Sequence, residues 1–184
     1  AHTAAVDYYR KHHTGVNYIP EPEPCENCLQ MDSLCPKANY LLPLVIHVVH
    51  LPSDSIGQGS NISEAQILHQ IELLNMFYRN YYGSNSINTG IQFCLAKKKP
   101  DGSPFDGINR ISSDSSNMHR NNQNELLNLV HYPTNQYINI YVVNGMLDPF
   151  NNPINVAGFA SFPYKGSRAN DLIVIRSDWF GDYT

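Results

Sequence analysis

The chain has 184 residues, of which 42% are hydrophobic and 15% charged, and its formal net charge is −4 at pH 7. This composition argues against a disordered chain, and the acidic balance leaves no basic footprint for nucleic acid. The longest apolar stretch, Leu41–Val49, is far too short to cross a membrane, so we expect no membrane partner. A chain of this length is by default one domain.

Residues 1–40 differ from the rest of the chain. They contain the Pro/Glu run at 20–24, which neither a helix nor a central strand accommodates, and three of the four cysteines. We interpret them as an extended N-terminal arm or a pro-segment-like extension. The globular part is predicted over residues 41–184.

The cysteines at Cys25, Cys28, Cys35 and Cys94 are disulfide candidates. Two disulfides are the simplest interpretation, with three possible pairings, and they indicate a secreted or extracellular protein. Two alternatives stay open: free or regulatory thiols, and a zinc site formed by the first three cysteines and a fourth ligand. Structural zinc sites usually combine two closely spaced couples, and Cys94 has no close partner in sequence. The glycosylation sequon Asn61-Ile62-Ser63 is too common by chance to decide anything.

The first predicted element is a strand over Leu41–His50, because the stretch is nearly all apolar and rich in valine and isoleucine. Five further strands and one short helix follow after a longer helix. The strands are predicted at Gly90–Lys98, Gly107–Ile111, Gln136–Val143, Val156–Phe162 and Asp171–Ile175, with the short helix near Asn122–Val130 and a loop over Asn144–Asn155. This order indicates an α/β sheet.

The longer helix is predicted over residues 63–82. Ser63 and Gln66 fit a capping box, and Ile62 and Ile67 fit a hydrophobic staple. Apolar residues then recur at alternating spacings of four and three, which predicts one buried face, and Gly83 ends the helix. The apolar face consists of Ile67, Ile71, Leu74, Tyr78 and Tyr81.

No local motif assigns a reaction to the chain. The zinc-peptidase string His-Glu-x-x-His is absent, and the inverted form fails because His69 and Glu72 are followed by Leu73. His47 and His50 are three apart on a predicted strand, so they point to opposite faces and do not chelate one ion together. The sequence therefore names no catalytic residue and no metal ligand.

Seven short segments nevertheless occur in a specific order. They are Leu42–Val49; Ile62–Ile67 with Gln70–Asn75; Thr89–Ala96; Pro100-Asp-Gly with Gly107–Arg110; Tyr137–Val142; Ala157–Pro163, which fits "G-x-A-x-x-P"; and Asp171–Ile175 followed by Phe180-Gly181. In this order, across about residues 41–184, they resemble the pappalysin-like metzincins, the family of ulilysin.

The resemblance implies a zincin-like α/β fold: a twisted mixed, mostly parallel sheet with a long backing helix, the N-terminal subdomain of a metallopeptidase catalytic domain. It implies a secreted zinc-dependent metalloendopeptidase acting on a peptide or protein substrate, with zinc as the cofactor of the complete enzyme and calcium as a further candidate. The family's zinc helix and methionine turn are absent from residues 1–184. We therefore expect this chain alone to be inactive and to need a C-terminal remainder of the catalytic domain as its partner.

The resemblance carries one site onto this chain, the edge strand that would bind an extended substrate. Its residues are Ala157, Gly158, Phe159, Ala160 and Ser161, and Gly158 is expected to leave room for close approach. An ordinary edge strand is the alternative for these residues. For the whole chain, the alternative function is a non-catalytic peptide- or protein-binding, or adhesive, extracellular module.

The resemblance also suggests a role for the arm. In related enzymes a pro-segment cysteine can cap the zinc, and Cys25 or Cys28 is the candidate here.

Overall fold

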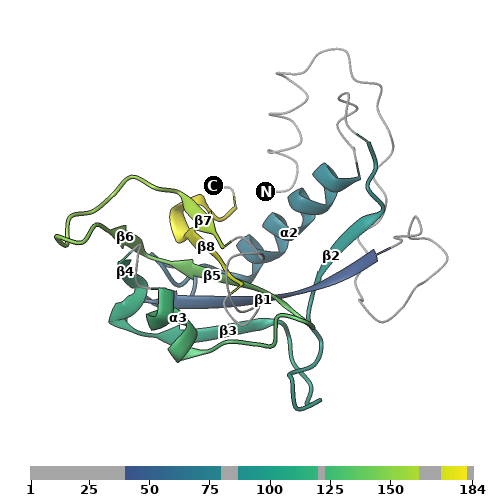
Figure 1. Cartoon of the computed structure of the whole chain (residues 1–184), viewed down its shortest axis with the longest axis horizontal. Helices are drawn as coiled ribbons and strands as arrows, with labels where there is room; N and C mark the ends of the chain where they lie inside the picture. Colours follow the sequence, from purple (N-terminus) through teal and green to yellow (C-terminus); the bar gives the residue numbers. More distant parts are fainter. Residues whose placement is uncertain (1–39, 80–86, 120–122, 162–170, 182–184) are drawn as a thin grey trace.

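The computed structural model describes residues 40–79, 87–119, 123–161 and 171–181. The predicted arm, residues 1–40, lies outside the described residues apart from Tyr40. Within the described part, a six-stranded sheet has a long helix on one face and smaller elements on the other (Figure 1).

The large sheet is mostly parallel. Its strands are β1 (Tyr40–His50), β2 (Ile91–Leu95), β3 (Ile108–Ser112), β5 (Ile138–Val143), β7 (Gly158–Ala160) and β8 (Ile173–Arg176). Their order is β2-β1-β5-β8-β7, with β3 also paired to β1, and only the β7–β8 pair is antiparallel. The predicted mixed, mostly parallel sheet is confirmed, with strand ends displaced by a few residues.

The central strand β1 pairs with three neighbours because it is long. Residues 40–44 pair with β2, residues 46–50 pair with β3 on the same edge, and residues 44–48 pair with β5 on the opposite edge. Its residues from Leu44 to Val49 are all buried. The continuous apolar run in the sequence therefore corresponds to a strand covered on both faces, as predicted.

Pro43 lies inside β1, where a missing N–H normally breaks a ladder. The backbone N–H groups of Tyr40 and Ile46 bond to Gly90 and Gly107, so even-numbered residues face β2 and β3. Pro43 therefore faces the side of β5, whose pairing begins only at Leu44. Pro43 therefore removes no hydrogen bond between β1 and its neighbouring strands.

Helix α2 (Glu64–Tyr78) begins as the sequence predicts. The Ser63 Oγ accepts a hydrogen bond from the Gln66 backbone N–H at 3.1 Å, and Ile62 and Ile67 are both buried. The second predicted hydrogen bond of the capping box, in which the Gln66 side chain would accept from the Ser63 backbone N–H, is wrong. The Gln66 side chain instead donates to the carbonyl oxygens of Ser177 and Phe180.

Helix α2 ends at Tyr78, four residues earlier than predicted, with Arg79 as its C-cap. The reason is that the Tyr78 carbonyl accepts from the N–H and the hydroxyl of Thr89, at 3.0 and 3.1 Å. This carbonyl is therefore engaged by the segment that leads into β2. Tyr78 packs edge-on against Phe93, whereas Tyr81 lies outside the described residues.

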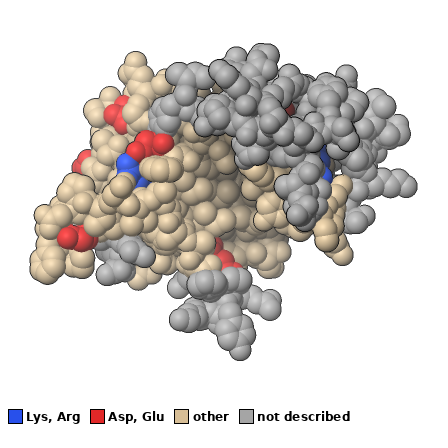
Figure 2. Space-filling model, turned by 90° about the horizontal axis from the view of Figure 1, so that it is seen from above, with Lys and Arg blue, Asp and Glu red and all other residues tan. Residues whose placement is uncertain are grey.

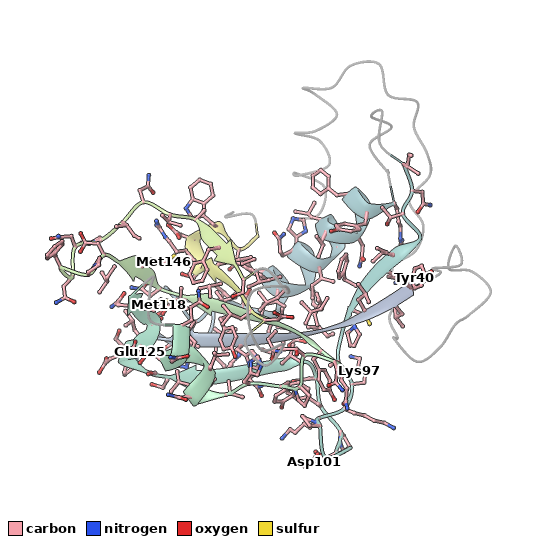
Figure 3. The ribbon with its side chains drawn as sticks, viewed as in Figure 1. Tyr40, Lys97, Asp101, Met118, Glu125 and Met146 are labelled. Carbon is pink, nitrogen blue, oxygen red and sulfur yellow. The ribbon has the colours of Figure 1, made fainter. Side chains whose placement is uncertain are left out.

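The opposite face of the sheet carries short elements: η1 (Asp114–Ser116), β4 (Asn117–His119), α3 (Gln123–Leu129) and β6 (Gly145–Leu147). Strands β4 and β6 form a two-stranded parallel sheet in which Met118 lies opposite Met146, close to α3 (Figure 3). Neither strand was predicted, and β6 lies in the segment assigned to a loop. Each has three residues, too few for a period-2 pattern.

Two apolar layers hold the sheet. The layer toward α2 contains alternate β1 residues together with Ile67, Ile71 and Phe180. The layer on the other face contains Met118, Leu126 and residues from β5 and β8. Since β8 contributes to both layers, the position of β7 beside it is fixed by the packing of the whole sheet.

His47 is a buried, neutral residue of the core. Its Nδ1 accepts from the Asn109 amide at 3.1 Å, so its Nε2 donates to the Asn139 Oδ1 at 2.9 Å. The ring stacks on Tyr141 and meets Tyr132 edge-on. Burial lowers the pKa of His47 to about 4, a shift that nearby His131 reinforces and the Asn139 bond opposes.

We predict that the free energy of unfolding falls as the pH decreases from about 6.5 to about 4. In this window the unfolded chain binds a proton at His47 and the folded chain does not, so this residue's contribution is present above pH 6.5 and lost below it. A shift of this size corresponds to about 3 kcal/mol. Urea titrations across this range measure it. His47→Gln should flatten the slope and His50→Gln should keep it; equal slopes in all three chains would contradict the assignment.

Candidate functional site

Strand β7 is the terminal strand of the sheet order. The Ser161 N–H bonds to the Leu172 carbonyl at 3.0 Å, and the Arg176 N–H bonds to the Ala157 carbonyl at 2.9 Å. In an antiparallel pair, alternate residues direct their main-chain groups toward the neighbour. The main-chain N–H and C=O groups of Gly158 and Ala160 therefore point away from β8.

Small residues line the outer edge of β7. Phe159 packs against the apolar layer that contains Val174, whereas Gly158 and Ala160 lie on the face turned toward α2. Ala157 and Ala160 are exposed. An extended chain thus meets little side-chain bulk when it approaches the outward main-chain groups.

The structure gives Gly158 a second reason to be glycine. A Cβ at this position would lie 2.6 Å from the Val174 carbonyl oxygen. Strand β8, the neighbouring strand, therefore requires glycine at this position on its own account. Any role of Gly158 toward a substrate stays a prediction.

We expect Gly158→Ala to lower the free energy of unfolding by about 1–3 kcal/mol, the usual cost of an overpacked site. The added methyl group meets a backbone oxygen, which does not move without separating β7 from β8. Ala160→Ser on the same face is the control and should be close to neutral. Thermal and urea unfolding measure both, and equal stabilities would show that β7 is not held at this spacing.

Residues 157–161 include no charged side chain. On the face drawn in Figure 2, the described residues form a largely uncharged surface with a few scattered charged side chains. Beside the entrance to β7, the guanidinium of Arg176 bonds to the Asp178 carboxylate and, at 3.5 Å, to the Asn155 side chain. The edge strand therefore presents main-chain hydrogen-bonding groups rather than a charge.

The described residues do not fit a catalytic metal. Residues 40–79, 87–119, 123–161 and 171–181 contain no group of three or more His, Cys, Asp or Glu side chains that could hold an ion. His47 uses both ring nitrogens within the core, and His50 bonds through Nδ1 to the Leu51 carbonyl. No catalytic step is therefore assigned to a metal bound by these residues.

The cysteines are only partly described. Cys94 lies buried on β2 opposite Pro43 and is disulfide-bonded. Cys25, Cys28 and Cys35 lie outside the described residues, so the pairing and any role in capping zinc stay predictions.

The sequon residue Asn61 belongs to the interior. It is 4% exposed, its amide donates to the Asp54 carbonyl at 3.0 Å, and its Oδ1 accepts from Arg110 at 2.6 Å. Arg110 also bonds to the Ile62 carbonyl just before α2. The folded chain therefore does not present Asn61 as a glycan acceptor.

We predict that Asn61→Ala lowers the free energy of unfolding by about 2–3 kcal/mol, because it removes a hydrogen bond to a half-buried guanidinium and a second one to the backbone. Asn88→Ala, at an exposed asparagine with one local bond to Gly90, is the control and should cost less than 1 kcal/mol, about the value of one exposed bond. Urea unfolding compares them. A folded chain that carries a glycan on Asn61 would refute the structural assignment.

Comparisons with known proteins identify the class of fold. Chains of mirolysin, a ulilysin-type metzincin, match with TM-scores of 0.65–0.66 and 28–29% identity. Neither a scan against protein-family models nor a search of the curated proteins found a match. The fold is metzincin-like, and the chain is related to a metallopeptidase.

Three of the matched structures are informative. Mirolysin in complex with compound 9 has 29% identity, with 79% of this chain and 55% of that chain covered. Mature mirolysin of Tannerella forsythia, in complex with a cleaved peptide, has 28% identity, with coverage of 81% and 57%. A promirolysin mutant of the same organism has 28% identity, with coverage of 81% and 50%. This chain thus spans about half the length of the matched chains.

Two further observations bear on the site. No described helix is long and apolar enough to cross a membrane. The polar contacts of Gln66 and Arg176 around the end of β8 were not predicted from sequence, since neither residue belongs to a motif that signals them.

Proposed function

We propose that this chain is the substrate-binding, N-terminal part of a secreted zinc-dependent metalloendopeptidase, and that residues 157–161 bind the substrate as an added strand. The observation that carries the proposal is the outer edge of β7, which pairs with no other described strand and on which Gly158 and Ala160 direct main-chain groups outward. The match to a mirolysin structure that contains a cleaved peptide supports a peptide as the ligand.

The chemistry of binding is main-chain hydrogen bonding. An antiparallel peptide runs opposite to β7, so its C-terminal half extends past Gly158 toward Ala157. Two outward-facing residues offer two donors and two acceptors, each worth about 0.5–1.5 kcal/mol net. Such binding is weak and tolerant of sequence, so selectivity has to come from side-chain contacts elsewhere in the protein.

We predict that Ala160→Pro weakens peptide binding about three- to tenfold, because proline removes one outward donor and its ring stands on the edge. The β7–β8 ladder does not use this N–H, so folding should be kept. Ala160→Val keeps the donor and is the matched control. A labelled, terminally blocked pool of hexapeptides is titrated with the 184-residue chain, and fluorescence anisotropy measures the affinity. Equal affinities of the two variants would show that peptides do not bind at the outer edge of β7.

The catalytic zinc belongs, on this proposal, to a part of the enzyme outside residues 1–184. When bound, such a metal polarises the substrate carbonyl and lowers the pKa of its water. The residues of this chain hold and orient the peptide, and possible calcium binding stays an expectation without assigned ligands.

We predict that the purified 184-residue chain retains no stoichiometric zinc and cleaves no peptide, because it has neither His-Glu-x-x-His nor a described cluster of metal ligands. Metal analysis after dialysis and a quenched-peptide assay with and without chelator provide the check. Chelator-sensitive cleavage by this chain would contradict the proposal.

The proposal also covers the N-terminal arm and the extracellular location of the protein. Residues 1–40 form an N-terminal extension, residues 41–184 form the subdomain, and two disulfides among Cys25, Cys28, Cys35 and Cys94 suit an extracellular protein. Intact mass with and without reductant, followed by peptide mapping, determines the pairing.

The second candidate function is a non-catalytic, extracellular peptide- or protein-binding module that keeps the sheet. It is favoured by the same open edge and by the lack of catalytic groups among the described residues. Both functions include peptide binding at β7. They differ in whether a longer product of the same gene carries a zinc-dependent peptidase activity.

A further inference from the structure

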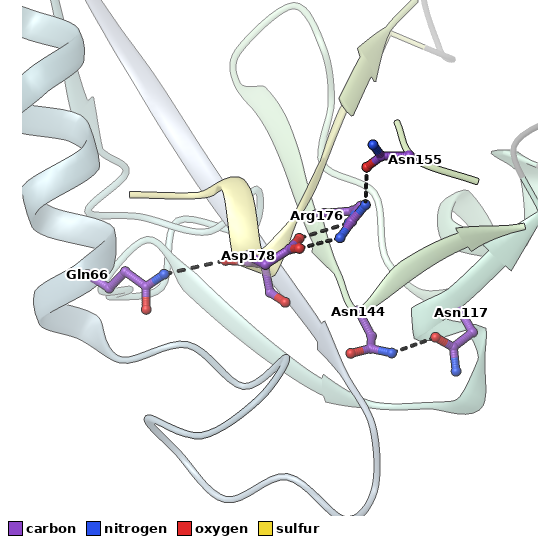
Figure 4. A network of polar contacts seen from close by, with 7 residues as sticks. Gln66, Asn117, Asn144, Asn155, Arg176 and Asp178 are labelled. Carbon is purple, nitrogen blue, oxygen red and sulfur yellow. Dashed lines mark hydrogen bonds and ion pairs between the residues drawn. The ribbon is translucent and has the colours of Figure 1, made fainter. Parts of the chain in front are cut away.

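The turn after β8 is held by helix α2. This turn is η3 (Ser177–Trp179), and the Gln66 side chain donates to the Phe180 carbonyl at 2.6 Å and to the Ser177 carbonyl at 3.4 Å (Figure 4). Phe180 is buried in the layer that also contains Ile67 and Ile71 of α2. The turn is therefore fixed to the helix by both packing and hydrogen bonds.

Arg176 connects this fixed turn to the entrance of β7. Its Nε donates to the Asp178 carboxylate at 2.8 Å, and a second guanidinium nitrogen contacts the other carboxylate oxygen. The remaining terminal nitrogen reaches the Asn155 side chain at 3.5 Å (Figure 4). Its backbone N–H bonds to the Ala157 carbonyl. One residue thus binds η3 on one side and the segment leading into β7 on the other.

The entrance to β7 is also held on its inner side: the Ile154 N–H bonds to the Met146 carbonyl at 3.0 Å, and Ile154 and Val156 pack against the apolar layer that contains Val174. The strand has three residues and pairs only with β8 among the described strands. Ala157 is exposed, and so is Asn155. Short edge segments with few buried contacts open at low free-energy cost. The Arg176 guanidinium therefore adds a restraint on the exposed side of this entrance, at Asn155.

The Arg176–Asp178 contact itself is not expected to stabilise the whole fold much. The Asp178 side chain is 44% exposed, and partly exposed ion pairs contribute little to global stability. The fork geometry of the guanidinium is nevertheless directional, because it engages two carboxylate oxygens at once and leaves its third nitrogen in a defined direction.

We propose that Arg176 is a positioning residue for the edge strand. Through Asp178 and Asn155 it holds the start of β7 in the extended position that pairing with an added peptide strand requires. This inference rests on the proposed function, because positioning of β7 matters only if β7 binds a peptide. The contacts of Arg176 are present in the ligand-free chain, so the positioning role and the peptide binding are tested in separate experiments.

The first experiment measures hydrogen exchange in the ligand-free 184-residue chain. Arg176→Met should accelerate exchange of the β7 amides that face β8, Phe159 and Ser161, about tenfold. Exchange of Tyr141 in the central sheet should stay unchanged. Asn155→Ala should reproduce the effect on β7, and the double variant should add little, because both changes break the same connection. Arg176→Lys should give an intermediate rate, since an ammonium lacks the fork that engages both partners.

Exchange at Phe159 and Ser161 that is unaffected by Arg176→Met and Asn155→Ala would overturn the positioning role, whether or not peptides bind. Accelerated exchange throughout the sheet would also overturn it, since Arg176 would then be a general stabilising residue.

The second experiment titrates the same variants with two labelled hexapeptide pools, one with free and one with amidated C-termini. Arg176→Met should weaken binding about three- to tenfold, and peptides with free and amidated C-termini should be affected equally. A loss confined to peptides with a free carboxylate would show that Arg176 binds the ligand directly, and would contradict the inference. No binding by the unmodified chain would refute the proposed function, while the exchange results would still decide the role of Arg176.

Discussion

The structure depends on one constraint: β1 must be buried on both faces while it pairs along both edges. Its eleven residues allow β2 and β3 to share one edge and leave the other to β5. Strand β8 then adds to β5, and β7 adds to β8. The free edge of β7 is the last position in this series. The place where a peptide is proposed to bind is therefore set by the burial of β1, a strand three positions away from β7.

Much of this arrangement follows from sequence. The buried strand, the start of α2 and the succession of elements along the chain are predictable, because each depends on local apolar pattern or on a cap at Ser63, whereas the pairing order of the strands is not. The end of α2 is not predictable in this way, since it is decided by Thr89, eleven residues after Tyr78. Likewise, β4 and β6 exist because Met118 and Met146 are buried together, which no local period indicates.

The edge position of residues 157–161 is predictable, whereas their binding of a substrate stays a prediction. Family resemblance places residues 157–161 on an edge, and the structure has β7 at the end of the sheet. The close contact with β8 requires glycine at 158 whether or not a ligand is bound there. The contacts of Gln66 and Arg176 join segments about 110 and 20 residues apart, and therefore leave no local signal in the sequence. The bonding of the Gln66 side chain to a distant turn, in place of the predicted capping bond, is a tertiary effect.

The central claim is that β7 accepts a peptide as an additional strand. A crystal structure of the chain with a bound hexapeptide tests it most directly. The account predicts a peptide antiparallel to β7, with main-chain hydrogen bonds to Gly158 and Ala160 and no change in the β7–β8 register. A peptide bound elsewhere, or bound beside β7 only through its side chains, would contradict it.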